Sequence, residues 1–596
     1  MIPPAELLSH LWAWALVWAL VILPGAAMAR LLPAPLRNRE SWAAWPMLGA
    51  AYWAAAVYLL PIPYALPAAL VLVVAMAALA ILRPNRPRGA ANRRRHPLAG
   101  MILAAGCLSY ATPLFVQHVP HGMDASRYAA GAPLVAANAY RLPRTLDPLV
   151  PGVPFGASNH GATVLAAMTL PLGAASWEAV IAESHLAFAC LVLGSYLLLR
   201  LFSRRLTSAC VAVASAWFTR NSQYTLGWGG WTNMLCLGMA LLATRAIIDS
   251  WRRGGLRGAA PLGLLIGALP LIQGTVAAGW LYVAVPAAAL TGALCSRRRR
   301  AGLAACLAGA AVAAVVLGAY VLTAHPTLTA DAKAWIHDWQ RLHGPDGEGW
   351  SLVAAVAPYV ARATDENLFY LGAAALAFLL ARGRWRPAAL LLLATATVAA
   401  IIVNHESWLL PGSPLLYPER ALYWTPVIAG ACVALAWRAL PARVRSDRRV
   451  MLACAAVLFA WSFARHMEYY QKVAREKVIS EPAWRALLWA RENLRGRGAV
   501  VADAYNTAGA YLPAVAEVAA TQYHLHVDQI CPRQPLPPPR TPTHVFYMDP
   551  WATNQKSLKP WQYEPDRQKL AELIARRAGR VVFDAGGVRI YELPQP

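Results

Sequence analysis

Residues 425–463 read TPVIAGACVALAWRALPARVRSDRRVMLACAAVLFAWSF, an apolar run, a loop that carries five arginines, and a second apolar run. A hydrocarbon core about 30 Å thick needs roughly 20 helical residues, so this stretch predicts two membrane-spanning helices joined by a short loop. Short loops rich in arginine are disfavoured for translocation, so the loop is expected on the cytoplasmic side.

The same alternation of apolar runs and arginine-rich loops recurs along the chain. An arginine cluster falls in every second gap between apolar runs. About fourteen spans are expected on this reading. They lie near residues 9–29, 43–60, 65–82, 98–117, 177–200, 207–219, 232–249, 260–273, 276–294, 303–323, 366–381, 387–403, 421–437 and 450–465. The alternation places the N-terminus outside, together with four other regions: 118–176, 324–365, 404–420 and everything after about 466.

The composition excludes a soluble protein. Hydrophobic residues make up 58% of the 596 positions and charged residues 14%, with a mean hydropathy of +0.41. The formal charge of +25 does not indicate a nucleic-acid partner, because the basic residues separate apolar spans; membrane lipids with anionic headgroups are the expected contact. The Ala- and Arg-rich composition is typical of GC-rich bacteria. We therefore expect a multi-pass protein of the bacterial cytoplasmic (inner) membrane.

From about residue 477 the composition becomes that of a soluble α/β domain. Strands are predicted at 498–503 and 543–548, and a hairpin at 580–584 and 588–592. Helical patterns at 482–494 and 565–577 alternate with them. The expected fold class is therefore an α-helical polytopic membrane protein with an extracytoplasmic C-terminal α/β domain.

The first large outer loop begins with His118-Val-Pro-His121-Gly-Met-Asp124-Ala-Ser-Arg127. A carboxylate at the mouth of a helix bundle, flanked by His121 and Arg127, can accept a proton from an incoming hydroxyl. The alternative is that Asp124 caps the helix expected over 125–137. Further along, Asn159 and His160 offer donors at a helix start, where a phosphate or sugar hydroxyl could sit; the alternative is an N-cap at Ser158 or Asn159.

The outer loop 404–420 carries four further candidates. Glu406, Tyr417 and Glu419 lie along it, and Arg420 begins the next span. A guanidinium at headgroup depth can hold a phosphate with two hydrogen bonds. The alternatives are an arginine that reaches the interface or pairs with Glu419. The scarcity of arginines on this face favours phosphate binding.

Two other outer segments carry weaker signals. Trp228 and Trp231 lie among glycines, an arrangement that suits sugar stacking but is also common at membrane interfaces. The segment 325–359 is rich in His, Asp and Glu without the spacing of a known metal site, so it predicts an amphipathic outer helix and loop over a cleft, with divalent-cation binding as the alternative. Nine cysteines imply no disulfide or metal framework.

This arrangement resembles the GT-C superfamily of polyprenyl-phosphate-sugar-dependent glycosyltransferases. In that superfamily a span is followed by a long outer loop with an acidic residue near its start, two interfacial helices and a return span; residues from His121 to Trp177 match this layout. The resemblance implies that Asp124 is the catalytic base. It divides the chain into an N-terminal transmembrane extension (1–97), a GT-C-like module with large outer loops (98–470) and the extracytoplasmic domain (471–596).

The resemblance implies an integral membrane glycosyltransferase. Sugar would pass from a polyprenyl-phosphate-linked donor to a cell-envelope glycan, lipid or protein by inverting displacement. No P-loop, dinucleotide fingerprint or nucleophile elbow is present in the sequence. The rival classes are a transporter or flippase of lipid-linked sugars and a non-catalytic GT-C-like assembly partner. A transporter would carry charges at the bilayer midplane and related halves, whereas the polar residues here gather on one face.

The arginine bias predicts that the basic loops are cytoplasmic and that residues 466–596 are external. A cysteine introduced near Asn554 should therefore react with a membrane-impermeant maleimide in intact cells, in a background without Cys531. A cysteine placed in the loop at Arg384 serves as the control and should react only after lysis. Protection of the site near Asn554 would overturn the topology.

Overall fold

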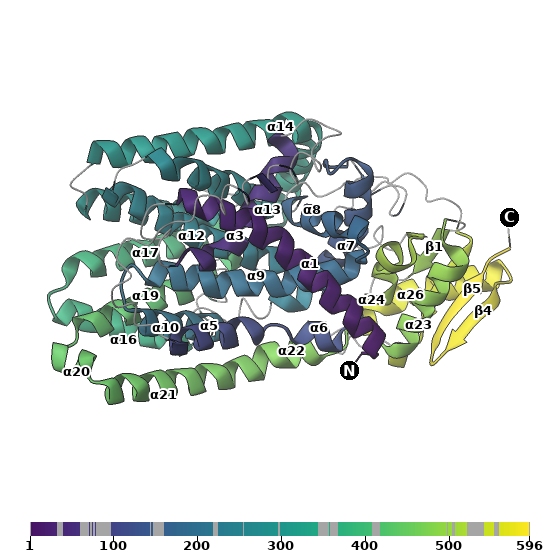
Figure 1. The fold of residues 1–596 in the computed structure, drawn as a ribbon. Helices are drawn as coiled ribbons and strands as arrows, with labels where there is room; N and C mark the ends of the chain where they lie inside the picture. The colour runs from purple at the N-terminus through teal and green to yellow at the C-terminus, as the bar shows by residue number, and fades with distance from the viewer. Residues whose placement is uncertain are drawn as a thin grey trace.

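The computed structural model describes a helical bundle with a small sheet domain at one end (Figure 1). The ranges it describes are 2–32, 40–59, 71, 74–75, 78, 97–143, 145–146, 149, 160–218, 225–253, 256–295, 299–343, 357, 361, 367–407, 410, 416, 418–496, 499–502, 507–520, 542–552 and 560–594, with the backbone alone in parts such as 323–343.

The bundle is built from apolar helices because a backbone in hydrocarbon must satisfy its own polar groups. Its helices are α1 (Pro4–Met28), α3 (Ser41–Leu59), α5 (Pro97–Leu108), α6 (Thr112–Val116), α7 (Met123–Ala137), α8 (His160–Thr169), α9 (Ser176–Leu199), α10 (Arg205–Phe218), α12 (Trp231–Arg253), α13 (Ala259–Cys295), α14 (Arg299–His343), α16 (Asn367–Ala381), α17 (Trp385–Ser407), α18 (Pro418–Leu422), α19 (Trp424–Ala439), α20 (Ala442–Ser446) and α21 (Arg448–His466).

The predicted polytopic fold class is confirmed by these helices. Among the described residues, eight helices are long and apolar enough to cross a membrane, and four shorter apolar helices accompany them. Helix α9 lies at the centre and is buried along its whole length. It packs closely on α12 because Gly194 and Gly238 face each other, and a Cβ on Gly194 would lie 2.5 Å from the Gly238 carbonyl oxygen. The predicted span at 65–82 lies almost wholly outside the described residues.

Helix α13 turns back on itself, as the two predicted spans at 260–273 and 276–294 require. The helix begins at Ala259, only eight residues after Trp251. Gly292, in its last turn, packs against the Trp251 side chain. A straight helix of this length would carry Gly292 about 50 Å away. The reversal occurs at Gln273, whose φ of −163° and ψ of 102° are extended. Gln273 therefore lies at the opposite end of the bundle from Trp251.

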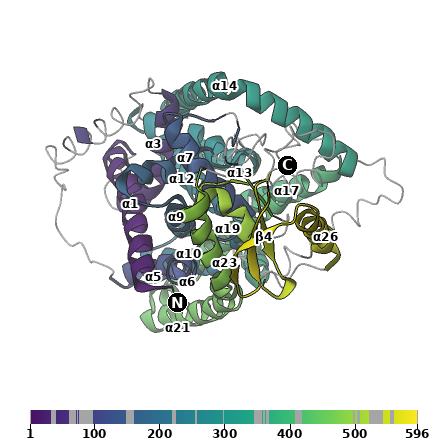
Figure 2. The same cartoon turned by 90° about the vertical axis from the view of Figure 1, so that its right-hand side faces the viewer.

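The C-terminal domain is the α/β unit that the sequence predicts. A π-helical turn (Met467–Gln471) and α22 (Lys472–Arg475) lead into α23 (Glu481–Leu494), β1 (Ala499–Ala502), α24 (Thr507–Ala510), β2 (Ala519–Ala520), β3 (His544–Met548), α26 (Pro560–Arg576), β4 (Arg580–Ala585) and β5 (Val588–Glu592). The strand order is β2-β1-β3-β5-β4, with β1, β2 and β3 parallel and the β4–β5 hairpin antiparallel. Figure 2 shows this domain in front of the bundle.

The domain contacts the loop between α6 and α7 directly. The Gln117 amide donates to the carbonyl oxygens of Ala474 and Glu476, each at 2.8 Å. His118 bridges the N-terminal helix and α23, with Nδ1 2.8 Å from Glu6 and Nε2 3.1 Å from Glu481. The N-terminus, this loop and the sheet domain therefore share one end of the molecule, while α20 lies at the other (Figure 1).

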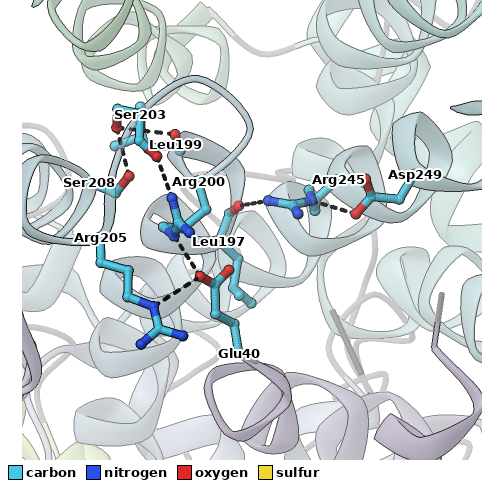
Figure 3. A network of polar contacts seen from close by, with 9 residues as sticks. All are labelled: Glu40, Leu197, Leu199, Arg200, Ser203, Arg205, Ser208, Arg245 and Asp249. Atoms are coloured by element: carbon cyan, nitrogen blue, oxygen red, sulfur yellow. Dashed lines mark hydrogen bonds and ion pairs between the residues drawn. The ribbon is translucent and has the colours of Figure 1, made fainter. Parts of the chain in front are cut away.

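Ion pairs hold the opposite end together (Figure 3). Glu40 is 4% exposed and accepts from Arg200 at 2.5 Å, with Arg205 at 3.9 Å. In α12, Arg245 donates to Asp249 at 2.6 Å and to the Leu197 carbonyl oxygen at 2.8 Å. Both side chains of the α12 pair are almost fully buried. These charges therefore neutralise one another near the basic end of the bundle.

We expect Asp249→Asn to lower the free energy of unfolding by about 3 kcal/mol, because it leaves the Arg245 guanidinium buried without its carboxylate. The thermal unfolding midpoint in detergent measures the loss. Asp447→Asn is the matched control, since Asp447 is an exposed helix cap and asparagine caps equally well. Equal midpoints for the two variants would show that the buried pair does not stabilise the fold.

Candidate active site

Asp124 lies in the first turn of α7, at the end of the bundle that contacts the C-terminal domain. The residue that precedes α7 as its N-cap is Gly122, and no side chain caps the helix, so Asp124 is not the cap. Its carboxylate is half-buried and stands where the positive end of the helix dipole favours a negative charge. Asp124 therefore lies, partly exposed, where the helix favours an ionised carboxylate.

Two glycine loops meet backbone to backbone beside Asp124. Gly122 and Gly229 both have a positive φ, of 86° and 85°. A Cβ on Gly122 would lie 2.0 Å from the Trp228 carbonyl carbon, and one on Gly229 would lie 2.6 Å from the Ala125 nitrogen. No larger residue fits at either position without moving a backbone. This contact places Trp228 against the start of α7.

Arg420 is held by the same loop. Its guanidinium carbon lies 4.6 Å from the centre of the Trp228 ring, which is within cation–π range. Its Nη1 donates to the Tyr423 hydroxyl at 3.0 Å, and that hydroxyl bonds the Thr225 hydroxyl at 2.9 Å. Residues 225–228 form one helical turn, so a single short segment supports Arg420 and contacts the Asp124 helix.

The charges of Asp124, Arg127 and Arg420 all affect the pKa of one buried hydroxyl, that of Tyr128. Tyr128 lies one turn after Asp124 and packs edge-on against Trp231, with ring centres 5.4 Å apart. Burial raises the pKa of Tyr128, the Asp124 charge raises it further, and the Arg127 and Arg420 charges lower it. Asp124, Arg127 and Arg420 therefore lie within electrostatic reach of the same group, although about 300 residues separate the first from the last.

His121 belongs to this cluster as a neutral group. Burial lowers its pKa from 6.5 to about 4, and a hydrogen bond with the Ala474 backbone opposes the shift only in part. The imidazole is therefore uncharged at neutral pH and can orient a ligand by hydrogen bonding but not by charge.

His160 begins α8, as predicted, and is fully buried. Its Nδ1 bonds the Tyr58 hydroxyl of α3, and the two rings meet edge-on at 5.3 Å. The neighbouring Gly161 packs against Leu271, so His160 stands beside the turn of α13. Of the other predicted residues, Asn159 and Tyr417 lie outside the described residues, and Glu406 and Glu419 are described by backbone alone.

Several residues of the cluster were not predicted as site residues. For Trp228 the sequence gives only weak evidence of sugar stacking, from the glycines that follow it. Tyr128 and Tyr423 carry no local signal. Tyr511, from the C-terminal domain, is fully buried and donates to the carbonyl oxygens of Pro120 and Gly122, the latter at 3.0 Å.

The structure shows no candidate metal site among the residues that it describes. There, no group of three or more His, Cys, Asp or Glu side chains is placed to hold a metal ion. In the segment 325–359, for which the sequence offers divalent-cation binding as an alternative, the structure describes no side chain except at position 357. Its backbone is helical to His343, in continuity with the span of α14.

No family model matches the sequence, and no curated protein matches it. Solved structures with a similar fold include the archaeal oligosaccharyltransferase AglB from Archaeoglobus fulgidus, in complex with an inhibitory peptide and a dolichol-phosphate. That match has 13% identity and a TM-score of 0.46, and it covers 83% of this chain and 74% of that one.

The arabinofuranosyltransferase AftD from Mycobacteria also matches, with 16% identity and a TM-score of 0.48 over 84% of this chain. A mutant form of it matches at 17% identity, a TM-score of 0.45 and 72% of this chain. The chain spans only 40% and 33% of the length of these two. The matched proteins are glycosyltransferases by name.

We expect Gly229→Ala to separate the two glycine loops and to destabilise the site, because the added methyl meets the Ala125 backbone. Gly173→Ala is the matched control: Gly173 has the same φ of 86°, with nothing within 4 Å of an added Cβ. It should lose only the cost of a left-handed alanine, about 1–2 kcal/mol. Thermal unfolding midpoints of the two variants measure the difference. Equal losses would show that the loop contact is not needed.

Proposed function

We propose that this chain is an integral membrane glycosyltransferase that transfers a sugar from a polyprenyl-phosphate-linked donor to an acceptor on the outer face. The observation that supports it best is the meeting of a carboxylate and an arginine at one end of the bundle. The charges of Asp124 and Arg420 both shift the pKa of Tyr128. The loop that carries Trp228 contacts the start of α7, which holds Asp124, and the Arg420 side chain. Inverting sugar transfer needs a base and a phosphate ligand, and these two side chains are the proposed pair.

Asp124 is the proposed base. The acceptor hydroxyl gives its proton to the Asp124 carboxylate while its oxygen forms a bond to the anomeric carbon of the donor sugar. The bond from that carbon to the phosphate oxygen breaks, and its electron pair leaves with the phosphate. A single displacement of this kind inverts the anomeric centre, and no covalent enzyme intermediate is required.

Arg420 is the proposed phosphate ligand. Its charge offsets the negative charge that grows on the departing phosphate, and the Trp228 ring and the Tyr423 hydroxyl orient its planar fork. Arg127 contributes a second positive charge in the same cluster. His160 is proposed to assist through its position beside the α13 turn, with Asn159, Tyr417, Glu419 and Glu406 as further substrate contacts.

A lipid-linked donor is proposed because the arginine bias predicts that the cluster lies on the outer side of the membrane. Nucleotide sugars and ATP are not supplied outside the cytoplasmic membrane, so the leaving group must arrive with the sugar. The acceptor is a cell-envelope glycan, a lipid or a protein. A transporter is disfavoured because the buried pair Arg245–Asp249 lies near the basic end and is closed by its own contacts.

We expect Arg420→Lys to weaken donor binding, because it keeps the charge but loses the planar fork, and Arg420→Ala to weaken it more, by about 10- to 100-fold. Binding of polyprenyl phosphate to the purified protein measures the effect. Arg384→Ala, which removes an exposed arginine at the other end of the bundle, should bind like the wild type. Unchanged donor affinity in Arg420→Ala would reduce Arg420 to an interfacial anchor.

We expect Asp124→Asn to fold, insert and bind the lipid-linked donor, yet to transfer sugar about 10²- to 10⁴-fold more slowly, because it removes the proton acceptor and keeps the shape. Rates are compared per folded molecule. Asp584→Asn, an exposed change in the C-terminal hairpin, is the control. An unstable Asp124→Asn protein with normal activity per folded molecule would contradict the assignment, with Glu406 or Glu419 then next in line as the base.

A further inference from the structure

A groove of about 440 Å³ opens between α10, α16, α19 and α21, far from the candidate active site. Its lining is almost wholly apolar. Leu206, Trp437 and Met451 lie at one end of it, and Leu458 and Trp461 lie at the other. The groove is separate from the cluster around Asp124, because its lining comes from α10, α16, α19 and α21 and includes none of the residues of that cluster.

The length of the groove matches one leaflet of a bilayer. From Met451 to Trp461 the helix α21 advances ten residues, or about 15 Å. That is half of a hydrocarbon core about 30 Å thick. Since α21 begins at Arg448, the groove occupies the half of the membrane next to the basic loops. A single acyl chain has this reach and this chemistry.

The mouth of the groove is cationic. Arg205 precedes Leu206, Arg438 follows Trp437, and Arg449 lies two residues before Met451. The Arg445 guanidinium donates to the Arg438 carbonyl oxygen at 2.7 Å, which holds it over the end of α19.

The one carboxylate in the α19–α21 connection is that of Asp447. It accepts from the backbone nitrogens of Arg449 and Val450 as the cap of α21. It therefore serves the helix start, and the guanidinium groups of Arg438 and Arg445 set the charge of the mouth. An anionic headgroup fits this mouth and a neutral one does not gain from it.

We propose that this groove binds an anionic phospholipid of the basic-side leaflet, with one acyl chain between α21 and the α10–α19 wall and its phosphate at Arg438 and Arg445. The lipid completes the packing of α21, whose face is open here: Val457 is 67% exposed and lines the groove. This inference is independent of the proposed glycosyl transfer.

Native mass spectrometry of the full-length protein tests it, with phosphatidylglycerol and phosphatidylcholine of identical acyl chains as probes. We expect one phosphatidylglycerol to be retained more tightly than phosphatidylcholine. Cys454→Trp fills the groove and should abolish that retention. Leu307→Trp, on the exposed face of α14, is the matched control and should retain the lipid.

A second pair of variants tests the headgroup without touching the wall of the groove. Arg438→Gln and Arg445→Gln should each weaken phosphatidylglycerol binding about fivefold and leave phosphatidylcholine unchanged. Arg382→Gln, another exposed arginine of the basic end, should have no effect. If Cys454→Trp does not fold, the two arginine variants test the proposal by themselves.

Three results would overturn the proposal. Equal retention of the two phospholipids would show that the charge of the headgroup does not contribute to binding. Full retention in Cys454→Trp places the lipid elsewhere. Displacement of phosphatidylglycerol by an equimolar polyprenyl phosphate would assign the groove to the tail of the glycosyl donor instead.

Discussion

The close contact between the Gly122 and Gly229 loops is the constraint on which the end of the bundle beside the C-terminal domain depends. Both glycines adopt a positive φ and approach each other's backbone within a distance that no side chain allows. Because of this contact, Trp228 lies at the start of α7 and Arg420 stacks on Trp228. One steric requirement thereby sets the spacing between a carboxylate and a guanidinium that are far apart in sequence.

The two ends of the bundle use charge in opposite ways. At the basic end, the buried Glu40 carboxylate pairs with Arg200 and the buried Arg245 pairs with Asp249, so that these charges stabilise packing. At the opposite end, Asp124 stays partly exposed and Arg420 is oriented by an aromatic ring and a hydroxyl. The difference follows from solvent access, since a buried charge needs a permanent partner and a partly exposed charge can exchange its partner.

Hydropathy and arginine spacing predicted the helices well because the bilayer imposes length and polarity directly. The runs at 177–200 and 232–249 appear as α9 (Ser176–Leu199) and α12 (Trp231–Arg253). The strands of the C-terminal domain were predicted because β-branched runs between turn residues are a local signal, whereas the two-residue strand β2 is too short to give one. Asp124 and Arg420 were singled out separately. Their meeting was not predictable, because it depends on Trp228 and Tyr128, whose roles come from tertiary contacts and leave no pattern in the sequence.

The loop that carries Asp124 is supported from both ends of the chain: Glu6 and Glu481 bind His118, and Tyr511 donates to Pro120 and Gly122. During synthesis, Asp124 leaves the ribosome almost 400 residues before Tyr511. The contacts around Asp124 are therefore completed only when the C-terminal domain has been made and has docked. A chain that ends before α23 holds every described helix of the bundle and still lacks the contacts of Glu481 and Tyr511, so this end of the molecule is the last to be completed.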